Sequence, residues 1–228
     1  MPSPFRRYAI YHVPGADLGA FGASWLGWDC VSGQPIANPA TSDWTVGARR
    51  YGFHATLKAP FRLAEGTTET QLLDGLAGLA QRTAPISLAG LEPQWMGRFL
   101  ALVPSMQSAQ LQSFAAQVVK EMDNFRMLTA EADQAKYANR NLSPQQQENL
   151  ANWGYPYVLD TFRCHLTLTD RVSKDARRAV NDALREALGD MPRPYVIDYV
   201  SVVGEGQDGM FYQIGRYALG APPVGSDR

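Results

Sequence analysis

YGFHATLKAPF, residues 51–61, and FRCHLTLTD, residues 162–170, both contain the pattern His-x-Thr-Leu, although the chain has only three histidines. Each stretch alternates apolar and polar side chains, which is the pattern of a β-strand with one buried face. Alternation turns His54 and Thr56 to one face of the first strand, about 7 Å apart along it. It does the same for His165 and Thr167 in the second strand. The sequence therefore predicts two strands that carry the same polar pair.

A cationic side chain shares each of these predicted faces, Lys58 in the first strand and Arg163 in the second. Either cation could add positive charge beside a bound phosphate. Each also has an ordinary alternative. Lys58 precedes Ala59-Pro60 and could simply be solvated where the strand ends, and Arg163 could pair with Asp160. Both alternatives stay open on the sequence alone.

The composition is that of a soluble globular protein, with 228 residues, 45% apolar and 19% charged, enough for one large domain or two small lobes. The net charge of -1 argues against broad capture of nucleic acid or of an anionic membrane. No apolar run reaches the ~20 residues of a membrane span, and the N-terminus shows no export signal. Two cysteines make neither a disulfide framework nor a zinc quartet. We therefore expect a cytoplasmic protein with no membrane partner, no metal and no cofactor.

The rest of the chain is predicted to alternate strands with amphipathic helices. Residues 126–157 are polar and rich in Gln and Asn, and Ser143-Pro144 is placed to start a short helix, which predicts a helical insertion. GEGQDG, residues 204–209, matches a dinucleotide-binding fingerprint letter by letter, but a strand follows it instead of a helix, which indicates a hairpin loop. Residues 220–228 are predicted to be a disordered tail. Strands are predicted at 5–13, 86–91, 98–103 and in a hairpin at 195–219, and helices at 16–29, 68–84, 108–125 and 173–189, the last with Ser173 as N-cap.

Two imidazoles that face one groove suit phosphoester chemistry without a metal. Imidazole titrates near neutral pH, so one ring can take a proton from the nucleophile while the other gives one to the leaving oxygen. Each such step contributes ~10²–10⁴-fold, and the threonine hydroxyls can donate to the non-bridging phosphate oxygens. The third histidine, His12, has no threonine two residues on. We therefore expect His12 to be structural or exposed. Alternation turns Cys164 away from its histidine neighbour, so we expect a buried, inert thiol there.

The paired motifs HATL and HLTL resemble the signature of the 2H phosphoesterase superfamily. The wider context, RYAIYHVP, RYGFHATLKAPFRL and WGYPYVLDTFRCHLTLT, resembles a bacterial branch encoded beside carbon–phosphorus lyase genes and described as phosphonate-metabolism proteins. The resemblance covers nearly the whole chain, residues 5–219. It implies an α+β fold in a single domain of two pseudo-symmetric lobes, with antiparallel sheets facing a central cleft and helices on the outside. One lobe is built around residues 51–61 and the other around 162–170.

The resemblance also implies roles for the motif residues: catalytic His54 and His165, phosphate-binding Thr56 and Thr167, and no required metal. The leading hypothesis is a phosphoesterase that opens a cyclic phosphodiester, or hydrolyses a small phosphodiester, of a small phosphorylated metabolite. A narrower version, from the family context, is a sugar phosphate of phosphonate breakdown such as a ribosyl cyclic phosphate. The alternative from another class is a non-catalytic module that binds a phosphorylated metabolite or an RNA end. No basic stripe with interleaved aromatics is visible, which argues against long nucleic acid.

Overall fold

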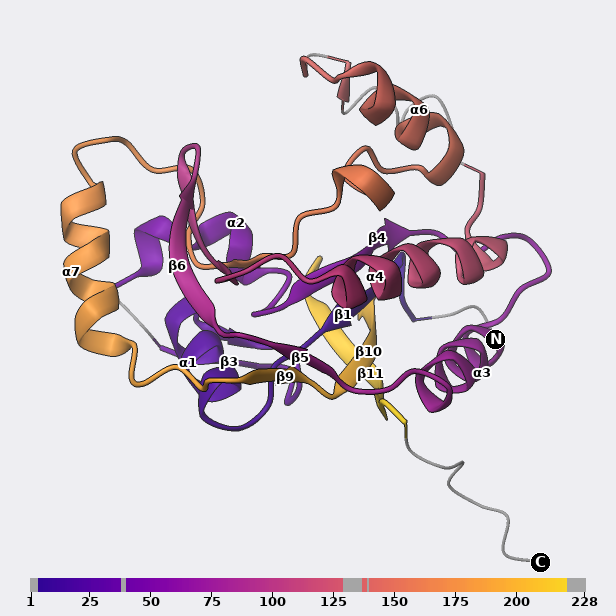
Figure 1. The fold of residues 1–228 in the computed structure, drawn as a ribbon, viewed down its shortest axis with the longest axis horizontal. Coiled ribbons are helices and arrows are strands. Elements are labelled where there is room, and N and C mark those ends of the chain that lie inside the picture. Colours follow the sequence, from indigo (N-terminus) through magenta and orange to yellow (C-terminus); the bar gives the residue numbers. More distant parts are fainter. Residues whose placement is uncertain (1–3, 38–39, 129–136, 139, 221–228) are drawn as a thin grey trace, which may run out of the picture.

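A seven-stranded antiparallel sheet organises the fold (Figure 1). The computed structural model describes residues 4–37, 40–128, 137–138 and 140–220. The strand order is β11-β10-β1-β4-β8-β7-β6, and each neighbouring pair is antiparallel, which confirms the predicted α+β class. The strands of this sheet are β1 (Tyr8–His12), β4 (Ala55–Phe61), β6 (Leu91–Met96), β7 (Phe99–Pro104), β8 (Leu166–Thr167), β10 (Tyr199–Glu205) and β11 (Phe211–Ala218).

The sheet has two halves that are joined by the pairing of Ala55 in β4 with Leu166 in β8. Strands β1, β4, β10 and β11 form one half, and β8, β7 and β6 form the other. Each half combines strands from distant parts of the chain, because β1 lies against β10 and β8 lies against β7. The two motif strands are therefore direct neighbours at the centre of the sheet, and the antiparallel halves meet at them.

Both motif strands begin later than alternation alone predicts. β4 starts at Ala55, because Gly52 makes a turn with φ +73° just before it. β8 spans only Leu166–Thr167, after which the backbone leaves the regular ladder. Thr169, which strict alternation would leave on the polar face, is instead fully buried, and its Oγ1 accepts a hydrogen bond from the N–H of Leu100 at 2.9 Å. Alternation therefore predicts the motif residues themselves but overextends the strands around them.

Helices cover the sheet, and two of them begin at capping boxes. Thr68 accepts a hydrogen bond from the N–H of Gln71 at 3.2 Å and starts α3. Ser143 caps α6 in the same way, immediately before Pro144, so the predicted start of the insertion helix is confirmed. The helices are α1 (Ala16–Leu26), α2 (Val46–Arg49), α3 (Glu69–Gln81), α4 (Ala109–Glu121), α6 (Pro144–Trp153) and α7 (Arg177–Ala187), with 3₁₀ turns η1 (Ser42–Trp44), η2 (Asp123–Phe125) and η4 (Leu159–Thr161).

The start of α7 differs from the prediction. The helix begins at Arg177, and Ala176 occupies the N-cap position without a side-chain hydrogen bond. The hydroxyl of Ser173 instead accepts from the N–H of Ala176 at 3.3 Å, which closes a turn ahead of the helix. The serine therefore caps a turn, as its sequence pattern indicates, but this turn begins four residues before the helix.

The main core lies between the sheet and the helices packed on it. α3 contacts β10 and β11, and α4 contacts β4. Leu72, Leu76 and Leu79 of α3 are fully buried, and each buried leucine contributes about 1.5–3 kcal/mol. On α1, Trp25 donates from Nε1 to the carbonyl of Leu168 at 2.7 Å. This bond ties α1 to the segment that follows β8, and so holds the second motif against the first half of the sheet.

The remaining predictions concern loops and chain segments. The N–H of Gly206 donates to the carbonyl of Met210 at 2.8 Å and β11 follows, so GEGQDG is a hairpin loop, as predicted. Residues 129–136 and 139 of the predicted insertion, and 221–228 of the predicted tail, lie outside the described residues. No helix in the described residues has the length and apolar character of a membrane span. Two small sheets complete the fold: β2 (Trp28–Asp29) with β3 (Gln34–Pro35), and β5 (Ile86–Leu88) with β9 (Tyr195–Ile197).

Candidate active site

The two motifs meet on one face of the sheet because β4 and β8 are antiparallel neighbours. The residue pair that joins them has both side chains buried. Counting one residue in each direction from the pair Ala55–Leu166, the antiparallel register places His54 opposite Thr167. It also places Thr56 opposite His165. Directly opposed side chains have Cβ atoms about 4.5–5.5 Å apart. The four predicted site residues therefore form one cluster, in which each histidine faces the threonine of the other motif.

His54 is oriented by the backbone that precedes it. Its Nδ1 lies 2.9 Å from the carbonyl oxygen of Gly52, and because a carbonyl can only accept, Nδ1 carries the proton of the neutral ring. Nε2 is then the acceptor, and the hydroxyl of Thr56 donates to it at 2.9 Å. A Cβ at position 52 would lie 2.7 Å from the side chain of Cys30. Glycine is therefore needed at the turn that orients His54.

His165 repeats this arrangement in the second motif. Its Nδ1 lies 2.8 Å from the carbonyl oxygen of Arg163, which again places the proton of the neutral ring on Nδ1. The ring of Phe99 contacts it with centroids 5.7 Å apart. Both imidazoles are therefore anchored through Nδ1 to the carbonyl two residues earlier. Nε2 of His54 is bonded to the Thr56 hydroxyl, which can rotate away when a ligand binds.

Burial favours the neutral form of both rings. It lowers the pKa of His54 from 6.5 to about 4, the bond to Gly52 opposes this, and the nearby His165 lowers the pKa further. Burial also lowers the pKa of His165. The ring of Tyr11 is stacked on His54 with centroids 3.6 Å apart and planes 17° apart. A neutral imidazole with an accepting Nε2 is chemically suited to act as a general base.

A cavity of about 350 Å³ opens beside this cluster, which is within the size range of small-molecule sites. Of the four motif residues, all except His165 line it. The predicted insertion contributes to its wall through Tyr137 and Tyr155. The insertion therefore shapes the space beside the motifs. The charged residues that line the cavity are Arg7, Arg62 and Arg126.

Lys58 does not reach this cavity, and its predicted supporting role is wrong. The side chain is only 3% exposed, and Nζ donates to the carboxylate of Asp123 at 2.8 Å and to the carbonyl of Val119 at 3.2 Å. The solvated alternative is equally wrong. The cause is a register shift between β1 and β4: Thr56 pairs with Tyr11 but Lys58 pairs with Ile10. Lys58 therefore lies on the face opposite to Thr56, where α4 packs on β4.

Arg163 is exposed and is not among the residues that line the cavity. In the described residues its guanidinium makes no ion pair with Asp160, whereas its carbonyl orients His165. Its predicted supporting role stays a prediction. The other two assignments are clear. His12 is buried and bonded through both nitrogens, to the carbonyl of Tyr199 and the hydroxyl of Tyr195, and burial raises the pKa of the Cys164 thiol to about 12.

Sequence reasoning missed Arg7 and Tyr11, which line the cavity from the first strand. Tyr11 pairs with Thr56 across β1 and β4. Positions 7, 9 and 11 alternate on one strand face, which was visible in RRYAIYHV. The signal that this face meets the motifs is the adjacency of β1 and β4, which alternation within one strand does not contain.

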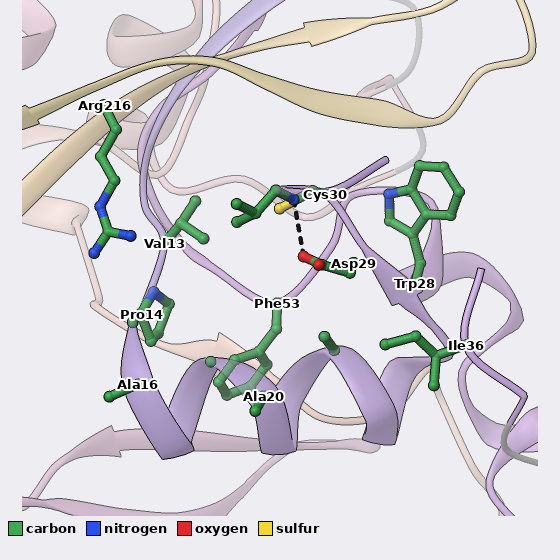
Figure 2. Close-up of a pocket in the computed structure, with 14 residues that line it drawn as sticks. Val13, Pro14, Ala16, Ala20, Trp28, Asp29, Cys30, Ile36, Phe53 and Arg216 are labelled. Atoms are coloured by element: carbon green, nitrogen blue, oxygen red, sulfur yellow. Dashed lines mark hydrogen bonds between the residues drawn. The ribbon is translucent and has the colours of Figure 1, made fainter. Parts of the chain in front are cut away.

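A second cavity, of about 380 Å³, lies between α1 and the β2 segment (Figure 2). Phe53, the neighbour of His54, points into it, and the absence of a side chain on Gly22 makes room for the Phe53 ring. The cavity wall is mainly apolar, and burial raises the pKa of the Cys30 thiol to about 12, which makes that thiol a poor nucleophile. No histidine is among its described lining residues. The candidate chemistry therefore belongs to the first cavity.

In the described residues, no group of three or more His, Cys, Asp or Glu side chains is arranged to hold a metal ion. Residues 56–213 match the family described as "Protein of unknown function (DUF1045)". The chain therefore belongs to this family. The matched span contains Thr56, His165 and Thr167, and it begins two residues after His54.

Two named relatives match about three quarters of this chain. The ribose 1,5-bisphosphate phosphokinase PhnN of Laribacter hongkongensis (strain HLHK9) is 37% identical over 175 residues, which is 74% of this chain and 41% of that protein. The protein of the same name from Janthinobacterium sp. (strain Marseille) is 36% identical over 174 residues, covering 72% of this chain and 38% of that protein. The chain thus spans about two fifths of the length of these relatives.

Among solved structures, E. coli LigT complexed with 3'-AMP has a TM-score of 0.45 and 15% identity, over 95% of this chain and 99% of that chain. At this identity and TM-score, the likeness does not bear on the chemistry of the site.

Proposed function

We propose that this chain is a phosphoesterase of the 2H type that opens a cyclic phosphodiester, or hydrolyses a small phosphodiester, by acid–base catalysis without a metal. The observation that supports this most directly is the pairing of β4 with β8, which brings His54, Thr56, His165 and Thr167 onto one face. Each histidine has Nδ1 anchored to backbone, so that Nε2 is available to exchange a proton with a ligand.

The reaction needs one proton taken and one proton given. One imidazole accepts a proton from water through Nε2 as the water oxygen bonds to phosphorus. The other, entering the reaction protonated, donates its Nε2 proton to the leaving oxygen as the second P–O bond breaks. The products are a phosphomonoester and a free hydroxyl. On binding, the hydroxyls of Thr56 and Thr167 turn to donate to the non-bridging oxygens, where negative charge is held.

Burial lowers the pKa of both imidazoles, and we base the proposed roles on the large shift of His54. Burial brings the pKa of His54 down to about 4, so His54 stays neutral and acts as the base. We assign the acid role to His165, whose pKa is lowered by burial but is raised again when an anionic phosphate binds beside it. With these roles, turnover falls at high pH as the acid loses its proton, and falls at low pH as the base gains one.

The substrate class is narrowed by the names of the two relatives. Both are named for a kinase that acts on ribose 1,5-bisphosphate, a phosphorylated sugar. Together with the resemblance to proteins of phosphonate metabolism, this supports a ribosyl cyclic phosphate as substrate. The cavity volume of about 350 Å³ suits a molecule of that size better than a long RNA.

The test is to measure, by phosphorus NMR, how fast the protein turns over each member of a panel of cyclic phosphates. His54→Ala and His165→Ala should each lower kcat by about 10²–10⁴-fold, and EDTA should leave turnover unchanged. Cys164→Ala is the matched control, because Cys164 adjoins His165 in sequence but lies on the opposite strand face. Undiminished turnover in the double histidine variant would refute acid–base catalysis by this pair. Tight binding of a phosphate ester that depends on Thr56, with no turnover of any probe, would favour the non-catalytic binding module.

A further inference from the structure

The charge around the catalytic cavity has one sign. Arg7, Arg62 and Arg126 line the cavity, and no Asp or Glu is among its described lining residues. A single phosphodiester carries one negative charge, and in the proposed mechanism the imidazoles and hydroxyls of the motifs already bind it. The cavity therefore offers cationic groups beyond those that one reacting phosphate requires.

Arg126 is ion-paired with Asp123, and Arg7 is held in place by a carboxylate of its own. Its Nε and Nη2 donate to the carboxylate of Glu205 at 2.6 and 3.0 Å, and Arg50 donates to the same carboxylate at 3.0 Å. The Glu205 side chain is only 7% exposed. Two guanidinium groups thus share one buried carboxylate, which leaves one positive charge in excess. In the described residues no hydrogen bond uses Nη1 of Arg7, so the fixed guanidinium still has donors for a ligand.

Several tyrosines line the cavity together with Arg7. Tyr51, Tyr137 and Tyr155 line the same cavity, and Arg7 and Tyr51 both contribute to the electrostatic environment of Tyr137. Burial raises the pKa of the Tyr137 and Tyr155 hydroxyls, so both remain O–H donors near neutral pH. The rings of these two tyrosines meet edge to face, and Arg50 lies over the ring of Tyr51. These ring contacts favour hydrogen bonding through the hydroxyls over stacking with a nucleobase.

The position of Arg7 along β1 sets its distance from the reacting centre. Tyr11 pairs with Thr56, and its ring covers His54, so Tyr11 marks the level of the motifs. Arg7 precedes Tyr11 by four residues, which separates their Cα atoms by about 13 Å along an extended strand. The backbone of Arg7 is thus displaced along the strand from the level of the motifs, while Tyr51 lies between them, with its ring centroid 6.4 Å from that of His54.

We infer that the cavity holds a second anionic group of its substrate, a phosphomonoester, between Arg7 and the tyrosines, while the reacting phosphate lies between the motifs. The substrate class is then a small sugar-like cyclic phosphate with a second phosphate at its other end. This inference rests on the proposed function for the reaction, but the binding site at Arg7 can be tested separately.

The experiment compares two probes that differ only in the second phosphate: ribose 1,2-cyclic phosphate with and without a phosphate on O5. The wild-type chain should prefer the doubly phosphorylated probe in kcat/KM by about 10- to 100-fold, as expected of a charge-assisted contact. Arg7→Met should abolish the preference and Arg7→Lys should restore part of it. Arg6→Met is the matched control, because the exposed Arg6 contacts Gln207 and does not line the cavity.

The affinity for ribose 5-phosphate, measured by calorimetry with ribose as the blank, tests the anion site at Arg7 separately from the proposed catalytic function. Affinity that falls with Arg7→Met but not with His54→Ala supports the second anion site even if no probe is turned over. Affinity that depends on the motif residues alone, or equal turnover of both probes by wild type, would overturn it. If Arg7→Met does not fold, Tyr155→Phe takes its place: a several-fold loss confined to the doubly phosphorylated probe supports the site, and no loss counts against it.

Discussion

Acid should destabilise this protein before its carboxylates begin to titrate, because two of its histidines are buried in the neutral form. Burial lowers the pKa of His12 and of His54 from 6.5 to about 4. Between pH 6.5 and pH 4 the unfolded chain binds protons that the folded chain does not bind. The free energy that these histidines contribute to folding is therefore fully present above pH 6.5 and is lost as the pH falls. The loss levels off below about pH 4, where both states are protonated.

The magnitude follows from the size of the pKa shift. A depression of 2.5 units corresponds to about 3 kcal/mol for each histidine at full protonation of the unfolded chain. Between pH 7 and 4.5 the expected loss is about 2 kcal/mol for each of the two. The window stops at pH 4.5 for a reason: the pKa of Glu205 is lowered by its hydrogen bond to Arg7, so that carboxylate costs stability only at lower pH.

The assay is urea unfolding at a series of pH values from 7 to 4.5, for wild type, His12→Gln and His54→Gln. Each variant should lose about a third to a half of the pH dependence of the wild type, whatever its stability at pH 7, because the lowered pKa of His165 contributes as well. NMR of the three imidazoles should show His12 and His54 neutral down to about pH 4. If both variants kept the full wild-type slope, the histidines would not be the groups that titrate, and the burial argument would be refuted.

Two further predictions concern residues near the motifs. Lys58→Met should leave turnover essentially unchanged but lower the free energy of unfolding by about 1–3 kcal/mol, because the buried Lys58 bonds the half-buried carboxylate of Asp123 rather than a ligand. Turnover and urea unfolding of one preparation measure both. Tyr11→Leu should lower kcat by about three- to tenfold and shift the pH–rate profile, because the ring stacked on His54 is lost. Tyr11→Phe keeps the ring and should keep the profile, and an unchanged profile in Tyr11→Leu would contradict a positioning role.

Local patterns predicted much of this fold. Alternation in HATL and HLTL identified the side chains that cluster at β4 and β8, and the Ser143 cap marked the start of α6. Those features depend on neighbours in sequence. Lys58 shows the limit: alternation placed it beside Thr56, but a register shift between β1 and β4 turns it to the opposite face, which α4 covers. Arg7 and Tyr11 were missed for the same reason, since only the pairing of β1 with β4 brings them to the motifs.

The pairing of β1 with β10 has a consequence for synthesis of the chain. Tyr8 lies opposite Gly204, so at 5–20 residues per second the ribosome makes β1 roughly 10–40 s before its partner strand. During that interval one edge of β1 has no strand to pair with, and open edges recruit other chains. A nascent chain that stalls before β10 would therefore be prone to aggregate, and the half of the sheet that carries His54 is the last to close.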